Sequence, residues 1–396
     1  MRAPMHAPMH VTDAALHRRP FAWALTLLIA ETVVTLWFVA GTHGWIVPLK
    51  GPLTTDFASF YAAGKLAVAG TPWLTYDRAA HLAAEWAATE PGVQYQFFFY
   101  PPVFLLLSAP LAMLPYLVAF AVFEAATLAL YLAALRPIVQ PVGRRWLVPA
   151  LGFPAVFWTL GLGQNAFLSA ALFALGTRLL DRRPLLAGLA LGALVFKPHL
   201  GLLVPLALLA GRHWRAIAGA ILGAGGLILL SWLVFGTHTW AAFLAAFVGA
   251  RGTYENGRIE LAGMITVFAS ARLLGVPTGW AYALQGVAAV AATVPMMVLF
   301  WRRAALPQRA AALLAATLLA VPVLLLYDLM LLAVAGAWLL AAARERGARP
   351  GETPILIAGY VIPLISRPIG LGLRIGLAPL ASAAVLVAAV RRGCDG

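Results

Sequence analysis

Charge and cysteine are both scarce in this sequence. Charged residues make up 11% of the 396 positions, whereas an ordinary soluble domain has about 25%. Hydrophobic residues make up 62%, and the mean hydropathy is +0.88. A water-soluble fold of this length could not bury that much apolar surface, so a soluble globular protein is excluded. Cys394 is the only cysteine, which excludes an intrachain disulfide.

Several motifs that bind metals or nucleotides are also missing. The sequence has no His/Cys cluster and no Asp-x-Asp pair, so we expect no metal site and no cofactor. It has neither a P-loop nor a G-x-G-x-x-G fingerprint, which argues against a nucleotide-sugar donor bound in the cytoplasm. The alternating segments of about ten residues that are typical of a membrane β-barrel do not occur either.

The sequence consists instead of long apolar runs separated by short basic clusters. The 28 Lys+Arg against 14 Asp+Glu give a formal net charge of +14. In a soluble protein this excess would suggest nucleic acid, but basic clusters between apolar runs follow the positive-inside rule. We therefore expect membrane lipids as partners and no nucleic acid. Both termini are predicted to be cytoplasmic, together with residues 18–19, 144–145, 182–183, 212–215, 302–303, 344–349 and 391–392.

The apolar runs predict an all-α integral membrane protein of about twelve transmembrane helices, in a single domain over residues 1–396. The first run, 21–41, is too long for the apolar region of a signal peptide and is predicted to be retained. Residues 101–114 are interrupted by Pro110 and are predicted to dip into the membrane without crossing it. The other predicted spans are 117–135, 146–161, 165–180, 184–197, 199–211, 216–235, 280–300, 307–326, 328–343, 354–369 and 371–390.

Two stretches are too polar to span and are predicted to be outer loops, residues 42–98 and 236–275. The first is predicted to hold two interfacial helices, 57–69 and 78–89. Asp56 stands at the start of the first of these helices and allows two interpretations. It could be an N-cap that satisfies backbone N–H groups. Thr54 or Thr55 could cap the helix instead, which would leave Asp56 for chemistry.

A set of short motifs occurs in the order found in one family. The motifs are Asp56-Phe57, Tyr61 to Gly64, Tyr76-Asp77, Tyr100-Pro101-Pro102, Pro110 to Pro115, Gly163-Gln164-Asn165, Lys197-Pro198 and Tyr327-Asp328. In their order and spacing the sequence resembles glycosyltransferase family 87. The members of that family are GT-C-type membrane enzymes related to polyprenyl-phosphate-mannose-dependent mannosyltransferases. One departure is Val321-Pro322-Val323, where the family often has a Ser-Pro-His-like stretch.

The resemblance implies a GT-C-type helix bundle in the bacterial cytoplasmic (inner) membrane, with its active site at the extracytoplasmic face. It implies transfer of a sugar, mannose first among the candidates, from a polyprenyl phosphate donor to a lipid-linked or glycan acceptor. Asp56 holds the family position of the acid at the head of the first outer loop. We therefore expect Asp56 to act as the general base while the acceptor hydroxyl attacks C1 with inversion.

A leaving phosphate needs cations, and the sugar needs polar side chains. The expected phosphate ligands are Lys197, His199, Arg251 and Arg258, with Arg367 and Arg374 as weaker candidates. The expected substrate-binding residues are Tyr61, Lys65, Tyr100, Gln164, Asn165, Tyr327 and Asp328. Each also has a structural interpretation: a snorkelling lysine, an interfacial histidine, solvated loop arginines, or residues that cap helices.

The alternative function is a polytopic transporter or lipid flippase. A bundle of about twelve helices is compatible with it. However, the sequence shows no inverted repeat and no pair of Gly/Pro-broken helices in matching halves, which are typical of secondary transporters.

Overall fold

A computed structural model describes residues 13–41, 56–140, 144–255 and 259–394. Within these residues the chain is helical and has no strand, apart from a single β-bridge between Met264 and Leu325. The α-helices are α1 (Asp13–Ala40), α2 (Phe57–Val68), α3 (Arg78–Ala88), α4 (Leu105–Leu111), α5 (Tyr116–Val139), α6 (Leu147–Leu151), α7 (Pro154–Leu162), α8 (Ala166–Leu179), α9 (Pro184–Gly192), α10 (Val204–Ala210), α11 (Trp214–Glu255), α12 (Val267–Leu273), α13 (Thr278–Trp301), α14 (Leu306–Ala320), α15 (Met330–Arg346), α16 (Glu352–Leu373) and α17 (Ala378–Cys394). Short 3-10 turns used below are η1 (Pro72–Tyr76), η2 (Pro102–Phe104), η5 (Ala193–Phe196), η6 (Leu261–Gly263) and η7 (Leu326–Leu329).

Six helical segments of the described chain are long and apolar enough to cross a membrane. They are Phe21–Ala40, Tyr116–Val139, Trp214–Val248, Thr278–Trp301, Leu326–Arg346 and Glu352–Leu373. Many of their large apolar side chains point outward: Trp280, for example, is 70% exposed and Leu36 61%. Such surface is stable against lipid rather than water, so the prediction of an all-helical membrane protein is confirmed. The other predicted spans fall on shorter helices, and the count of about twelve crossings is not confirmed.

Prolines and glycines account for the places where the helices differ from the predicted spans. The predicted span 146–161 is divided into α6 and α7, because the chain turns at Gly152 and restarts with Pro154 at the first helical position. The predicted span 199–211 contains only the seven-residue helix α10. Conversely, α11 does not end at Gly236. That residue has φ 77° and ψ 169°, so the helix bends there and continues into the predicted second outer loop.

Helices α9 and α11 pack against each other through glycines. Gly188 and Gly192 on α9 face Ala216 and Ala220 on α11; a Cβ at Gly188 would lie 2.0 Å from the Ala216 carbonyl oxygen. On α11, Gly219 likewise has no room for a Cβ, which would lie 2.1 Å from the Leu185 carbonyl oxygen. Small residues four apart on facing helices are the usual means of close helix packing in membranes.

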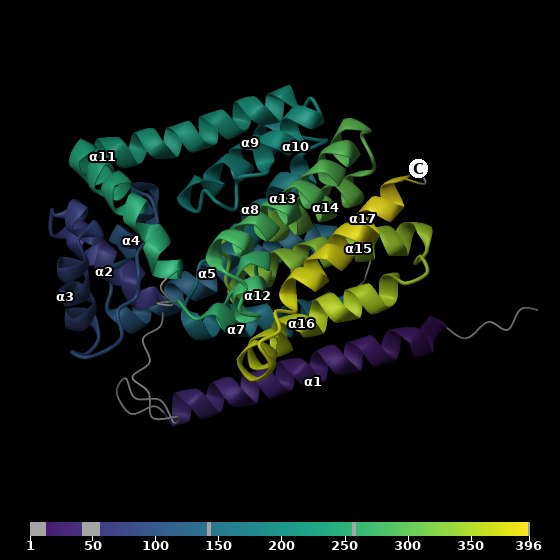
Figure 1. Cartoon of the computed structure of the whole chain (residues 1–396), viewed down its shortest axis with the longest axis horizontal. Helices are drawn as coiled ribbons and strands as arrows, with labels where there is room; N and C mark the ends of the chain where they lie inside the picture. Colours follow the sequence, from purple (N-terminus) through teal and green to yellow (C-terminus); the bar gives the residue numbers. More distant parts are fainter. Residues whose placement is uncertain (1–12, 42–55, 141–143, 256–258, 395–396) are drawn as a thin grey trace, which may run out of the picture.

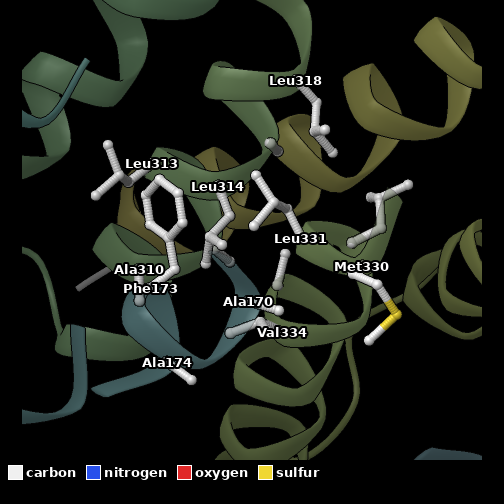
Figure 2. Packing of buried hydrophobic residues seen from close by; sticks show 14 of the residues in the cluster. Ala170, Phe173, Ala174, Ala310, Leu313, Leu314, Leu318, Met330, Leu331 and Val334 are labelled. Atoms are coloured by element: carbon white, nitrogen blue, oxygen red, sulfur yellow. The ribbon is translucent and has the colours of Figure 1, made fainter. Parts of the chain in front are cut away.

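The centre of the bundle is α14, whose residues from Gln308 to Ala320 are all buried. It packs against α13, α15 and α17. Figure 2 shows how Phe173 of α8, Leu314 of α14 and Leu331 of α15 meet in this core. A helix that is buried on all sides is held firmly, and α14 leads into η7, which carries Asp328. One wall of the site described below is therefore anchored in the core.

The described part of the predicted first outer loop, residues 56–98, folds into a cluster at one end of the molecule. There α2, α3 and α4 lie together, and the far end of α11 reaches over them (Figure 1). The two predicted helices are present as α2 and α3, but residues Phe57 to Gly64 of α2 are buried among aromatic rings of the protein. The placement of these helices at a membrane surface is not confirmed and stays a prediction.

Candidate functional site

A cavity of about 2040 Å³ lies between this end cluster and the bundle. It is lined mostly by aromatic and aliphatic side chains from α1, α5, α7, α11 and the segment 94–100. The predicted site residues that line it are Asp56, Tyr100, Gln164, Lys197, His199, Tyr327 and Asp328. Residues far apart in the sequence are thus brought to one hollow, which is large enough for a substrate with a sugar and part of a lipid chain.

Asp56 lies at the start of α2 but does not cap it. Its backbone is helical (φ −58°, ψ −19°) rather than extended, and its side chain accepts no capping hydrogen bond. Instead, its Oδ2 accepts a hydrogen bond of 2.7 Å from Nε2 of Gln164. Asp77, by contrast, is extended (φ −88°, ψ 119°) and caps α3 by accepting from the N–H of Ala80 at 2.9 Å. Of the two interpretations of Asp56, the structure therefore excludes the N-cap.

The surroundings of Asp56 raise the pKa of its carboxyl group toward neutrality. Removal from bulk water raises the pKa of Asp56 to about 6, and the Gln164 hydrogen bond and the positive charge of Lys197 limit that rise. A carboxyl with a pKa close to neutrality is a stronger base than an ordinary aspartate and is still ionised at pH 7. The environment therefore suits proton abstraction.

The end of α7 aims Gln164 at Asp56. The helix ends at Gly163 in the left-handed conformation (φ 67°), and a Cβ at this position would lie 2.7 Å from Cβ of Phe57. Glycine is thus needed both for the turn and for the close approach to the start of α2. Oε1 of Gln164 accepts from the hydroxyl of Tyr100 (3.4 Å) and from the N–H of Asn165 (3.2 Å). These bonds fix the amide so that its N–H donates to Asp56.

Lys197 is buried and already paired. Its Nζ lies 2.6 Å from Oδ1 of Asp328 and donates to Oδ1 of Asn165 at 3.4 Å. It also lies 4.9 Å from the centre of the Tyr327 ring. Asp328 in turn accepts from the N–H of Leu325 through Oδ2 (3.1 Å). The predicted cation therefore has its charge balanced within the protein, and Nδ2 of Asn165 is buried with no hydrogen-bond partner.

The remaining predicted residues lie in different surroundings. His199 is exposed to the cavity, and the pKa of its imidazole is lowered by the surrounding protein and by Lys197. The hydroxyl of Tyr61 donates to the Leu114 carbonyl oxygen at 2.8 Å, and Lys65 is exposed beside the Tyr61 ring. Neither lines the cavity.

Two predicted phosphate ligands cannot be compared with the structure. Arg251 lies near the end of α11, but its side chain lies outside what the structure describes. Arg258 lies outside the described residues altogether. Both therefore stay predictions. Among the residues that are described, no group of three or more His, Cys, Asp or Glu is placed to hold a metal ion.

Sequence reasoning missed a row of rings on the cavity wall. Tyr95, Phe97 and Phe99 line the cavity and are half-buried, whereas Phe98 is buried in the aromatic core and Tyr100 belongs both to that core and to the cavity wall. The signal was present as a concentration of aromatic residues between positions 95 and 100. Rings 97 and 99 are parallel, 5.3 Å apart. Aromatic faces and edges of this kind suit either a sugar or an isoprenoid chain.

A buried acid and histidine anchor this row of rings. Oε2 of Glu85 accepts from the N–H of Gln96 at 3.0 Å, and Oε1 lies 3.5 Å from Nδ1 of His81. Burial, and then the charge of Asp56, raises the pKa of Glu85 to about 8, although the Gln96 N–H opposes the rise. Burial lowers the pKa of His81 to about 4. Burial therefore favours the uncharged form of both side chains, and the neutral form of Glu85 limits the negative charge near Asp56.

A second ion pair lines the same cavity. Nε of Arg367 on α16 lies 2.7 Å from Oε2 of Glu260, just before η6. The side chains are 39% and 45% exposed, respectively. Sequence reasoning treated Glu260 as part of a polar loop and Arg367 as a weak candidate, because nothing local links two residues 107 positions apart.

Comparison with known proteins identifies one family. The model of glycosyltransferase family 87 matches residues 98–326, which is more than half of the chain. Comparisons with curated proteins and with solved structures find no match. The matched region contains Tyr100, Gln164, Asn165 and Lys197, and ends two residues before Asp328. The chain is therefore a membrane protein that belongs to glycosyltransferase family 87.

Proposed function

We propose that this membrane glycosyltransferase moves a sugar, mannose first among the candidates, from a polyprenyl phosphate donor to a lipid-linked or glycan acceptor. The transfer takes place at the extracytoplasmic face of a bacterial cytoplasmic membrane and inverts the anomeric centre. Family membership supports the glycosyl transfer itself. The mostly apolar cavity, which includes side chains of α1 and α5, suits a donor that carries a lipid chain.

The observation that carries this proposal is the state of Asp56. It is the only Asp or Glu among the described cavity-lining residues that has neither a cationic side chain bonded to it nor a capping role. Its side chain accepts a hydrogen bond from the neutral amide of Gln164, and its pKa is raised to about 6. A carboxylate that no cation neutralises keeps its basicity for a substrate proton.

The chemistry follows from that basicity. The acceptor hydroxyl attacks C1 of the donor sugar while its proton passes to Asp56. The bond between C1 and the phosphate oxygen breaks, and its electron pair leaves with the phosphate. Attack opposite the leaving group inverts C1, so a β-linked donor gives an α-linked product. Gln164 holds the carboxylate in place, and the positive field of Lys197 keeps it ionised before the reaction.

Lys197 and His199 remain the proposed ligands of the donor phosphate, together with Arg251 and Arg258. Lys197 and His199 line the same cavity as Asp56. The Lys197 charge is shared with Asp328 at 2.6 Å, so we assign Lys197 mainly to setting the field and holding Asn165. Tyr100, Gln164, Tyr327 and Asp328 line the space where the sugar would lie.

The test is the Asp56→Asn protein, purified in nanodiscs and assayed for sugar transfer from a polyprenyl phosphate sugar. Asparagine keeps the shape and the contact with Gln164 but cannot take the proton, so the rate should fall by about two to four orders of magnitude. Donor binding and thermal stability should hardly change. The matched control is Asp77→Asn, since Asp77 does cap a helix and asparagine caps about as well. Activity of the Asp56 variant within a few-fold of wild type would remove the base assignment.

The transporter alternative has no specific support in the structure. The family match names a transferase, and the same assay separates the two functions, because a flippase forms no glycosidic bond.

A further inference from the structure

The cavity has few cations for binding an anionic substrate group. Among the described lining residues, Lys197 and Arg367 are the only lysine and arginine. Lys197 is buried against Asp328, and removing a partner from such a pair leaves an uncompensated buried charge. A substrate that bound Lys197 in place of Asp328 would leave the carboxylate of Asp328 buried without a counter-charge. Arg367 is the remaining cation, and its surroundings are different.

The Arg367 pair is weak and open. Its guanidinium meets Glu260 through a contact of 2.7 Å, and both side chains are more than a third exposed. Ion pairs with this exposure contribute little to stability. Glu260 lies on the short stretch between residues outside the described chain and η6, whereas Arg367 lies within the long helix α16. The cation thus lies on a helix, and the carboxylate lies on a short non-helical stretch.

The position of Arg367 is fixed against the element that leads to Gln164. Its guanidinium carbon lies 5.9 Å from the centre of the Trp158 ring, and the Trp158 indole N–H donates to the Pro363 carbonyl oxygen at 3.1 Å. These contacts fix α16 to α7, whose end carries Gly163 and Gln164. Arg367 and Asp56 line the same cavity, so a substrate that fills this cavity can contact both.

A guanidinium that holds a carboxylate can also hold a phosphate. Arginine binds either group through two parallel, charge-assisted N–H bonds. In this structure Glu260 accepts from Nε of Arg367. A phosphate that enters the cavity can displace this carboxylate at little cost, because Glu260 is already close to water.

We propose that Arg367 binds the phosphate group of a lipid substrate, and that Glu260 occupies the guanidinium until that phosphate arrives. This deepens the proposed function and rests on it for the identity of the substrate as a lipid phosphate. Arg367 lies outside residues 98–326, so family membership assigns it no role. The empty enzyme thereby carries a balanced pair instead of a lone cation facing an apolar cavity.

Substitutions of Arg367 and of Glu260 should have opposite effects on the binding of a lipid phosphate. We would measure binding of sugar-free polyprenyl phosphate to the full chain in nanodiscs. Arg367→Gln should weaken binding by at least about tenfold, since a charge-assisted contact is lost. Glu260→Gln should tighten binding by roughly two- to fivefold, since the competing carboxylate is removed. Arg272→Gln is the control, because Arg272 lines neither this cavity nor the small pocket that adjoins Glu260 and donates instead to the Val276 carbonyl oxygen.

Binding measurements with two further lipids show which phosphate Arg367 binds and whether the proposal holds. Polyprenol, which lacks phosphate, should bind all three variants like wild type. A second outcome is that neither substitution changes the binding of polyprenyl phosphate, whereas Arg367→Gln weakens and Glu260→Gln tightens the binding of an anionic phospholipid, phosphatidylinositol. In that case Arg367 holds the acceptor's phosphate. If both substitutions weaken phosphate binding alike, or if neither lipid responds, the pair is only structural and the proposal is overturned. No sugar transfer is measured, so this outcome is independent of the Asp56→Asn assay.

Discussion

The hydrogen bond from Gln164 to Asp56 offers a sharp test of how the site is tuned. We consider Gln164→Met, which keeps the volume of the side chain but removes its N–H donor. The lost bond of 2.7 Å favours the charged carboxylate. Hydrogen bonds to charged groups are worth about 1.5–3 kcal/mol, and one pKa unit is 1.36 kcal/mol. The pKa of Asp56 should therefore rise by about one to two units.

The sign of the effect on the rate follows directly. Asp56 works as a base only when it is deprotonated, so activity is present above its pKa and is lost as the pH falls through it. In the wild type that acid limb should lie at about pH 6. In Gln164→Met it should move upward to roughly pH 7–8. Activity at pH 9 should recover most of the wild-type value, provided that Asp56 keeps its position.

The assay is the pH dependence of kcat/KM, which reports the free enzyme. Gln94→Leu is the control: Gln94 lines the same cavity, but Asp56 owes its shifted pKa to burial, Gln164 and Lys197. The acid limb of the Gln94→Leu pH profile should stay at the wild-type pH. An acid limb that does not move in Gln164→Met, or that moves to lower pH, would refute the assignment of the limb to Asp56 and the role of Gln164 in tuning it.

Two other predictions concern stability and topology. Lys197→Met should lower the free energy of unfolding by about 3–5 kcal/mol, because Asp328 is left buried without its partner. Adding Asp328→Leu should recover much of this loss. Thermal unfolding in detergent measures the stability of the two variants, and a double variant no more stable than Lys197→Met would contradict the prediction. In a Cys394→Ser background, an impermeant thiol reagent applied from outside should label Glu90→Cys but not Glu345→Cys, both of which are exposed; the reverse pattern would invert the proposed orientation.

The helices near the site were predictable because their signals are local. Gly70 and Pro72 end α2, and Pro91 follows the end of α3, so both helices occur within about one residue of their predicted ends. The same local rule could not decide between Asp56 and Asp77 as caps. The two residues are chemically identical, and only their backbone conformations, helical for one and extended for the other, separate them.

The chemistry of the site was only partly predictable because its bonds are long-range. Gln164 and Asp56 are 108 positions apart, and Glu260 and Arg367 are 107 apart. The resemblance to the family pointed to Asp56 and Gln164 but could not show that one donates to the other. Arg367 lies beyond the matched region, so only the fold could bring it to the cavity.

The break in α11 was missed for a different reason. Glycine at position 236 favours the end of a helix in sequence terms, but here the chain bends and resumes as helix up to Glu255. Packing of the second part of α11 over η1 and η2 provides contacts that stabilise this continuation. No local pattern at the glycine itself indicates those partners.

The buried pair of Lys197 and Asp328 constrains the order in which the chain can assemble. The two residues are 131 positions apart, and at about 5–20 residues per second the ribosome needs roughly 7–26 s to pass from one to the other. During that interval the lysine has been made and its carboxylate has not. Because an uncompensated charge is costly in an apolar interior, we expect the segment around Lys197 to stay in contact with water until α14 and η7 emerge. The ion pair would then act as a checkpoint late in synthesis, closing the cavity wall only when both halves of the bundle are present.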